Sequence, residues 1–207
     1  MSAENGKTRV KLCGMFRPED IDAVNQVRPD FVGFVVDFPR SHRSVSPQEL
    51  AELAPCVASG IRRVGVFVNE PVEIVASLYE QGLIHVAQLH GGEDEQYLAS
   101  LRAICPVPTI QAFKVRTAAD VVRAQASTAN LVLLDNGQGT GEVFDWSLLE
   151  GVGRPFMLAG GLGPHNVAEA IAAVHPWGVD MSSGIETSRI KDPTKMAAAV
   201  AAARGAI

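Results

Sequence analysis

A regular alternation of short apolar runs with longer amphipathic runs extends along the whole chain and constrains its fold more than any other feature. Each apolar run is rich in Val, Ile, Leu, Phe and Ala, which is typical of parallel strands buried on both faces. The predicted strands are Arg9–Leu12, Phe31–Val36, Arg63–Val68, His85–Leu89, Thr109–Phe113, Leu131–Leu134, Pro155–Ala159 and Gly178–Met181. Such alternation implies parallel pairing with right-handed helical crossovers.

The runs between these strands predict helices of matching number. They cover Arg17–Val27, a segment that begins after Ser46, Val72–Tyr79, Asp94–Ala103, Ala118–Ala126, Asp145–Leu149, Asn166–Val174 and Pro193–Arg204. Repetition of the strand–helix unit predicts an α/β protein, a (β/α)8 TIM barrel that forms a single domain over residues 1–207. The length of 207 residues lies near the lower limit of about 200 residues for this fold. A doubly wound open sheet is the alternative.

One helix carries a complete start signal in its sequence. Ser46 is a preferred N-cap residue, Pro47 suits the first helical position, and Glu49 can complete a capping box. The sequence therefore predicts a helix that begins at Pro47.

Composition excludes several classes of protein. The net charge is −5 and the basic residues are scattered, which disfavours a nucleic-acid partner. No apolar stretch is long enough to cross a bilayer, and the N-terminal segment lacks the apolar core of a secretory signal. Cys13, Cys56 and Cys105 are far apart, which favours a reduced, cytoplasmic protein without disulfides. Nothing in the sequence indicates an oligomeric state.

Polar residues and glycines gather after the carboxyl ends of the predicted strands, where barrel enzymes place their active sites. Alternation along the first strand points Val10 and Leu12 towards the helices, and Lys11 and Cys13 towards the barrel interior. An inward lysine needs an anionic partner and favours the thiolate of a nearby cysteine. Cys13 is thus a candidate catalytic thiol. A small residue that fills the core and a redox-active thiol are the alternatives.

Asp135 is the candidate acid. It shares the inward face of its strand with Leu133 and precedes the glycine-rich segment Gln138–Gly141. Burial among apolar groups raises the pKa of an aspartic acid, as a general acid near neutral pH requires. Alternatively, Asp135 caps the loop through hydrogen bonds to nearby backbone.

Two further loops are candidates for holding anions. Glycine-rich and hydroxyl-bearing loops after the last two strands of a barrel frequently bind phosphate, and here they contain Gly160, Gly161, Ser182, Ser183 and Gly184.

The remaining candidates lie after the second and fourth predicted strands. Arg43 has a guanidinium suited to a carboxylate or phosphate, or is simply solvated. Gln88 and His90 share the inward face of the fourth strand and are predicted as supporting residues.

Several motifs follow one another along the chain: KLCG at Lys11–Gly14, GF and SxRxVSP within Gly33–Pro47, RVGVFVN at Arg63–Asn69, QLHG at Gln88–Gly91, LLD at Leu133–Asp135, GTGxxFDW at Gly139–Trp146, LAGGLxPxNV at Leu158–Val167, VDMSSGIE at Val179–Glu186 and KD at Lys191–Asp192. Through these motifs the whole chain resembles the phosphoribosylanthranilate isomerase family. The chain departs from the family pattern at Gln138, and it lacks a proline–glycine pair within 187–190.

The resemblance implies an isomerase of tryptophan biosynthesis that carries out a metal-free, cofactor-free Amadori rearrangement of N-(5-phosphoribosyl)anthranilate. It implies Cys13 as general base, Asp135 as general acid and Arg43 as the ligand of the anthranilate carboxylate. Lys11, Gln88 and His90 are expected to contact the substrate. A non-catalytic sugar-phosphate binding barrel and a histidine-pathway isomerase are the alternatives, and the latter expects an aspartate where Cys13 stands.

Overall fold

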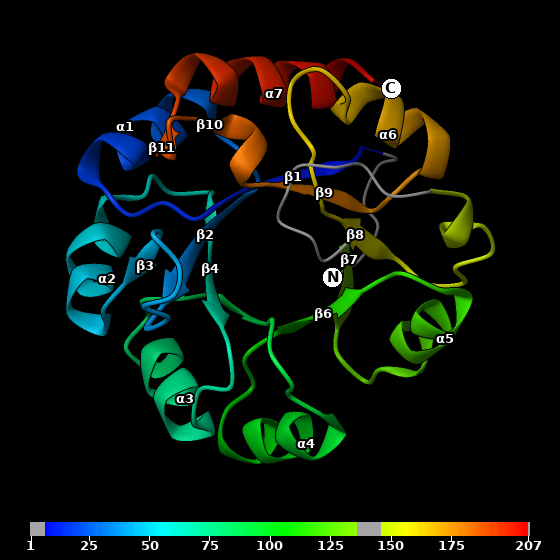
Figure 1. Ribbon diagram of the computed structural model, residues 1–207. Coiled ribbons are helices and arrows are strands. Elements are labelled where there is room, and N and C mark those ends of the chain that lie inside the picture. The colour runs from blue at the N-terminus through cyan, green and yellow to red at the C-terminus, as the bar shows by residue number, and fades with distance from the viewer. Residues whose placement is uncertain (1–6, 136–145, 207) are drawn as a thin grey trace.

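Parallel strands close into a barrel in this protein. The computed structural model describes residues 7–135 and 146–206. The barrel strands are β1 (Arg9–Cys13), β2 (Phe31–Val36), β4 (Arg62–Phe67), β5 (Val86–Leu89), β6 (Thr109–Lys114), β7 (Leu131–Asp135), β8 (Phe156–Leu158) and β9 (Gly178–Met181). β1 pairs in parallel with both β2 and β9, so the sheet has no open end between them (Figure 1). The predicted barrel is confirmed, and the open sheet is excluded.

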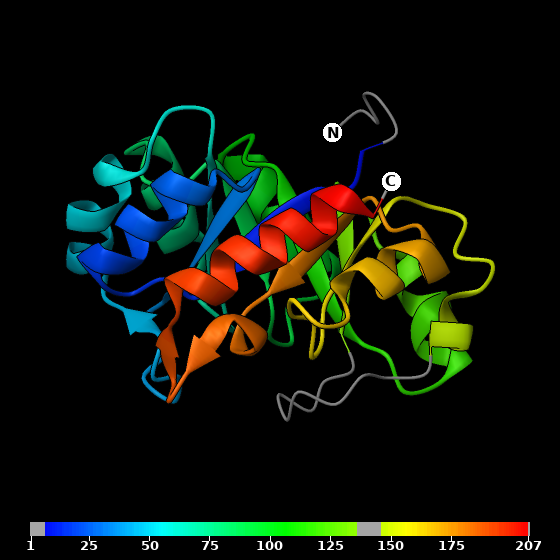
Figure 2. The same ribbon diagram turned by 90° about the horizontal axis from the view of Figure 1, so that it is seen from above.

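Helices surround the barrel in the predicted order (Figure 1). They are α1 (Pro18–Val27), α2 (Pro47–Leu53), α3 (Val72–Glu80), α4 (Glu95–Ile104), α5 (Ala118–Ala126), α6 (Val167–Val174) and α7 (Pro193–Gly205). Figure 2 shows α7 lying across β1 and β9. In the described part of the crossover from β7 to β8, the 3-10 helix η2 (Trp146–Leu149) is found and no α-helix. Asp145 and the Gln138–Gly141 segment lie outside the described residues. No helix in the described part of the chain has the length and apolar character to span a membrane.

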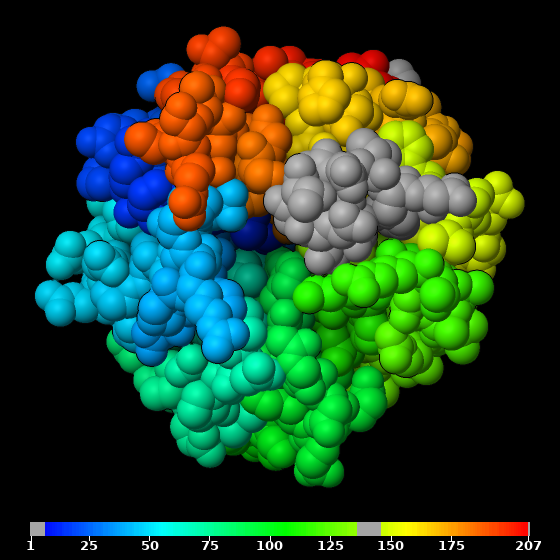
Figure 3. Space-filling view, in the orientation of Figure 1, coloured from blue at the N-terminus to red at the C-terminus, as the bar shows by residue number. Residues whose placement is uncertain are grey.

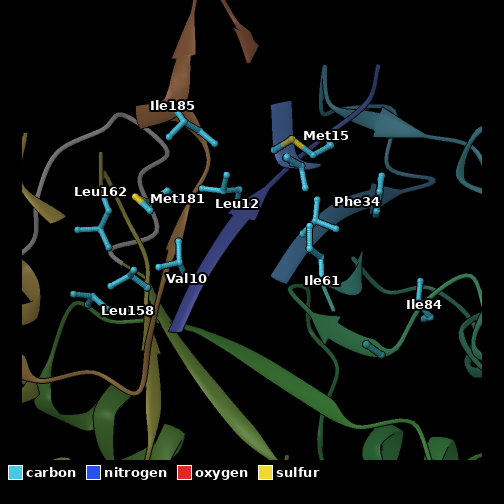
Figure 4. Packing of buried hydrophobic residues seen from close by; sticks show 14 of the residues in the cluster. Val10, Leu12, Met15, Phe34, Ile61, Ile84, Leu158, Leu162, Met181 and Ile185 are labelled. Carbon is cyan, nitrogen blue, oxygen red and sulfur yellow. The ribbon is translucent and has the colours of Figure 1, made fainter. Parts of the chain in front are cut away.

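Strand alternation divides the core into two layers. Val10 and Leu12 of β1 belong to the outer layer, between the sheet and the helices, and Met181 on the neighbouring strand lies in the same layer (Figure 4). The inner layer fills the barrel and contains Cys13, Phe31, Val64, Val66, Val86, Ile110, Leu131, Leu133, Met157 and Ala159. Lys11 is completely buried. The predicted inward orientation of Lys11 and Cys13 is confirmed.

Three short strands and two short 3-10 helices were not predicted. β3 (Ser44–Val45) extends the sheet beside β2, and β10 (Glu186–Thr187) pairs antiparallel with β11 (Ile190–Lys191). The 3-10 helices are η1 (Ala54–Cys56) and η3 (Ser183–Ile185). Strands of two residues are too short to show alternation. The β10–β11 turn places Ser188 and Arg189 at φ +50° and +65°, and it lacks the glycine that normally marks such a turn.

The predicted start of α2 is confirmed. The Ser46 hydroxyl accepts a hydrogen bond from the Glu49 backbone N–H at 3.2 Å, and the Glu49 carboxylate accepts one from the Ser46 N–H at 2.7 Å. This reciprocal pair satisfies two backbone donors that the helix itself leaves unpaired. It also fixes the point at which the chain passes from β3 into α2.

We expect Ser46→Ala to lower the free energy of unfolding by about 1 kcal/mol, because it removes the N-cap acceptor. Urea unfolding of both proteins measures the difference. Ser77→Ala, on the exposed side of α3, is the matched control and should change stability by less than about 0.5 kcal/mol. Equal effects of the two substitutions would contradict the capping role.

Candidate active site

A cavity of about 270 Å³ opens at the carboxyl ends of the barrel strands. Figure 3 views this face, where the orange β10–β11 hairpin meets the light-blue loop that follows β2. Nearly all of the residues predicted for the site line the cavity: Cys13, Arg43, Gln88, His90, Asp135, Gly160, Gly161, Ser182 and Ser183. Phe38 and Asp180 also line it. The structure therefore brings residues from across the whole sequence to one place.

Cys13 lies beside a buried ion pair. Lys11 donates a hydrogen bond from its ammonium Nζ to Asp180 Oδ2 at 2.8 Å. Gly33 on β2 leaves the room for this arrangement. A Cβ atom there would lie 2.7 Å from Cys13 Sγ and 3.1 Å from Lys11 Nζ. The thiol and the ammonium thus occupy one small space, and the ammonium also contacts the carboxylate of Asp180.

Burial has the largest effect on the Cys13 thiol, and it raises the pKa. Lys11 lowers that pKa, as the sequence predicts, but Asp180 raises it, and the thiol ends above its ordinary value. Lys11 thus favours the thiolate, but burial and Asp180 outweigh it in the protein without a ligand. Burial on its own would lower the pKa of Lys11, yet Asp180 and Cys13 raise it. Lys11 therefore stays a buried ammonium.

Asp135, His90 and Gln88 form a chain of polar side chains along one wall. Asp135 ends β7, and its Oδ2 lies 3.7 Å from His90 Nε2. His90 Nδ1 in turn lies 3.0 Å from Gln88 Nε2. The Asp135 side chain keeps about a fifth of its surface exposed, so it can reach a ligand in the cavity. No cluster of three or more His, Cys, Asp or Glu side chains suited to a metal ion occurs among residues 7–135 and 146–206.

Arg43 forms a two-pronged ion pair that the sequence did not predict. Its Nε and Nη2 donate to Glu186 Oε1 and Oε2 at 2.6 and 2.7 Å, and Lys191 Nζ also contacts Glu186 Oε1 at 2.7 Å. Burial raises the pKa of Glu186, but hydrogen bonds from Arg43 and Lys191 outweigh it and lower that pKa to about 2. Glu186 therefore joins the loop after β2 to the β10–β11 hairpin.

Gly14 allows Arg43 to lie over the end of β1. Its φ is +82°, and a Cβ atom at this position would collide with the Arg43 side chain. Both Gly14 and Glu186 belong to motifs that the sequence shows, but their partners become visible only in the folded chain.

The predicted phosphate loops follow β8 and β9. Around the barrel, β6 and β7 separate these two strands from β5, which carries Gln88 and precedes His90. Gly160 and Gly161 have φ values of +97° and +64° and lie in the loop after β8, one residue beyond its end. Ser182 donates a hydrogen bond to the Cys13 carbonyl at 3.0 Å, and Ser183 begins η3. Gly184 lies against the Leu162 backbone, where a Cβ atom would collide with the carbonyl oxygen. Gly184 thus packs the two loops together.

Comparison with known proteins identifies close relatives. The family model described as N-(5'phosphoribosyl)anthranilate (PRA) isomerase matches residues 10–202. N-(5'-phosphoribosyl)anthranilate isomerase of Endomicrobium trichonymphae is 37% identical over 193 residues, which cover 91% of this chain and 94% of that protein. Phosphoribosyl anthranilate isomerase from Thermotoga maritima has a TM-score of 0.87 at 33% identity, with 96% of this chain and 99% of that chain covered. Another crystal structure of the enzyme, in complex with reduced 1-(o-carboxyphenylamino)-1-deoxyribulose 5-phosphate, has a TM-score of 0.84 at 33% identity and the same coverage.

We expect Glu186→Gln to destabilise the protein in a pH-dependent way. The pKa of Glu186 in the folded protein, about 2, lies below the ordinary value of 4.5, so its ionised form stabilises the fold above about pH 4.5 and loses this effect as the pH falls towards 2. The difference in melting temperature between the wild type and the variant should be largest above pH 5 and shrink towards pH 3. A difference that stays constant over this range would contradict the ion-pair account.

Proposed function

The chain belongs to the N-(5'-phosphoribosyl)anthranilate isomerase family, and on that premise we propose that it rearranges N-(5-phosphoribosyl)anthranilate to 1-(2-carboxyphenylamino)-1-deoxyribulose 5-phosphate. This is an Amadori rearrangement, an internal redox isomerisation of a sugar, in tryptophan biosynthesis. One observation carries the proposal: Cys13 and Asp135 line a single cavity from two different strands. The ligand of the related crystal structure is a reduced form of this product and supports the same substrate class.

The proposal extends to the whole chain and its setting. Residues 1–207 form a single domain that acts on a small molecule in the cytoplasm and needs no metal or cofactor. The barrel supplies an acid, a base and two anion sites. Because the rearrangement oxidises one carbon of the sugar and reduces its neighbour, it requires no external oxidant or reductant.

Asp135 is the general acid in this mechanism. It gives its proton to the furanose ring oxygen, the bond between that oxygen and C1′ breaks, and the anthranilate nitrogen forms an iminium with C1′. His90, at 3.7 Å from Asp135 Oδ2, and Gln88 behind it hold the carboxyl group towards the cavity. Such positioning is what a general acid requires, because proton transfer needs hydrogen-bond contact with the reacting atom.

Cys13 is the general base. Its thiolate removes the proton from C2′, and the electron pair of that C–H bond forms the C1′–C2′ double bond while the iminium nitrogen becomes neutral. The C2′ hydroxyl group of the resulting enolamine then loses its proton, and C1′ gains a proton. The product of this tautomerisation is the ketone. Lys11 does not touch the reacting carbon in this account. Its ammonium is buried next to the Cys13 thiol, so it acts on the reaction through the charge that it places beside the sulfur.

The two ends of the substrate are held by separate groups. Glu186 occupies the Nε/Nη2 edge of Arg43, so the anthranilate carboxylate is expected to bind through Nη1. Gly160, Gly161, Ser182 and Ser183, with Gly184 packed behind, surround the proposed phosphate site. Fixing both ends places the reacting carbons between acid and base. Positioning of this kind supplies up to roughly 7–11 kcal/mol of barrier reduction in the best intramolecular models.

The two alternatives make different predictions. A histidine-pathway isomerase expects an aspartate at the end of β1, and this chain has Cys13 there. A non-catalytic sugar-phosphate binding barrel would tolerate loss of either Cys13 or Asp135. The proposed enzyme would lose turnover in both cases.

We expect Cys13→Ala and Asp135→Asn each to lower kcat by at least about 100-fold, since each removes a proton-transfer group. Loss of substrate fluorescence, followed with purified protein, measures the rate. Binding of the reduced product analogue should persist within about threefold in both variants, which serves as the folding control. Full turnover by Cys13→Ala would remove the general base from the mechanism.

We expect Arg43→Met to raise KM roughly 10- to 100-fold, because a hydrogen-bonded charge contact contributes about 1.5–3 kcal/mol. The matched control is a substrate analogue that lacks the anthranilate carboxylate. The wild type and Arg43→Met should use this analogue with similar KM. If the variant impairs both substrates equally, Arg43 acts on the fold of the loop and not on the carboxylate.

A further inference from the structure

Asp180 uses only half of its carboxylate to bind Lys11. Its Oδ2 accepts the hydrogen bond from Lys11 Nζ, but Oδ1 is buried and has no hydrogen-bond partner among the described residues. The residue is 92% buried, with 8% of its surface exposed at the cavity. A buried carboxylate oxygen without a partner is costly, and its excess negative charge lies next to the candidate base. This arrangement calls for a functional explanation.

Charged groups face Cys13 from three elements. Lys11 lies on its own strand β1, Asp180 on the neighbouring strand β9, and Lys191 on β11. Lys191 contacts the Glu186 carboxylate and the Ser182 carbonyl, and it affects the pKa of the Cys13 thiol less than Lys11 and Asp180 do. From β2 the nearest residue is Gly33, which has no side chain to contribute. Lys11 and Asp180 are therefore the pair that most directly controls the charge beneath the thiol.

We propose that Lys11 and Asp180 are positioning residues that set the proton affinity of Cys13 in opposite directions. Lys11 favours the thiolate, and Asp180 offsets the ammonium so that the sulfur stays basic enough to take a proton from carbon. A lone ammonium would yield abundant thiolate of low basicity, and a weak base removes a proton from carbon slowly. The inference rests on the proposed function in that it takes Cys13 as the base.

Alkylation of Cys13 by iodoacetamide tests the proposal on the thiol itself. The thiolate is the reactive form, so peptide-resolved mass spectrometry over a range of pH follows its population. At pH 7 we expect Cys13 of Asp180→Asn to react at least about tenfold faster than Cys13 of the wild type. Cys13 of Lys11→Met should react at least about tenfold slower. A tenfold change in thiolate population corresponds to a shift of about one unit in the pKa of the thiol. The exposed Cys56 is the reference thiol in the same sample.

Two controls keep the test decisive. Asp30→Asn breaks the ion pair with Arg9 at the other end of β1 and should leave Cys13 alkylation unchanged. The double variant Lys11→Met/Asp180→Asn removes both charges without leaving either unpaired, so it remains informative if a single variant fails to fold. Its reactivity should lie between those of the two single variants. Shifts of both single variants in the same direction, or no shift in either, would overturn the proposal.

Turnover separates this inference from the proposed function. In Asp180→Asn the acid limb of the kcat profile should move to lower pH, and the maximal kcat should fall at least about tenfold. Alkylation shifts accompanied by an unchanged kcat profile would overturn the inference and leave the proposed function intact. A wild type without isomerase activity would overturn the proposed function, and with it the role of Cys13 as base.

Discussion

The ion pair between Lys11 and Asp180 is the interaction on which the site depends. A lysine ammonium inside a barrel is tolerated only with an anion beside it, and strand alternation leaves Lys11 no other direction to point. Asp180 lies opposite Lys11 in the register of β1 and β9, where the sheet closes. Removing one partner of a buried pair typically costs about 3–5 kcal/mol. The pairing of β1 with β9 that closes the barrel therefore also places the two charges next to Cys13.

Glu186 performs a comparable task at the mouth of the cavity. It holds Arg43 from one loop and Lys191 from the hairpin, so two segments far apart in the sequence share one carboxylate. The arrangement fixes the Nε/Nη2 edge of the guanidinium, and Arg43 lines the cavity. A preorganised arginine loses less conformational entropy when a ligand binds. The proposed anion site at Arg43 thus depends on the same ion pairs that join the two segments at the rim.

Sequence reasoning predicted the parts that depend on periodicity and missed those that depend on tertiary contacts. Alternation gave the barrel and the inward direction of Cys13, and the capping box gave the start of α2. The β10–β11 hairpin was not predicted, because its turn residues Ser188 and Arg189 are not typical of such turns. Alternation also indicated that Lys11 lies beside Cys13 and favours its thiolate. The extent of burial and the position of Asp180, which keep the pKa of that thiol above its ordinary value, are properties of the folded core.

The proposed acid and the proposed base lie in different surroundings, as the proposed chemistry requires. Asp135 lies at the wall near His90 with part of its side chain exposed, whereas Cys13 lies deeper, above a compensated ion pair. An acid must release its proton to the ring oxygen before a base can draw a proton from C2′, because the iminium is what makes that C–H bond acidic. Two identical carboxylates close together would share one proton. The thiol next to Lys11 and Asp180 and the carboxyl group on β7 therefore lie in different surroundings, yet both line the cavity proposed to hold the sugar.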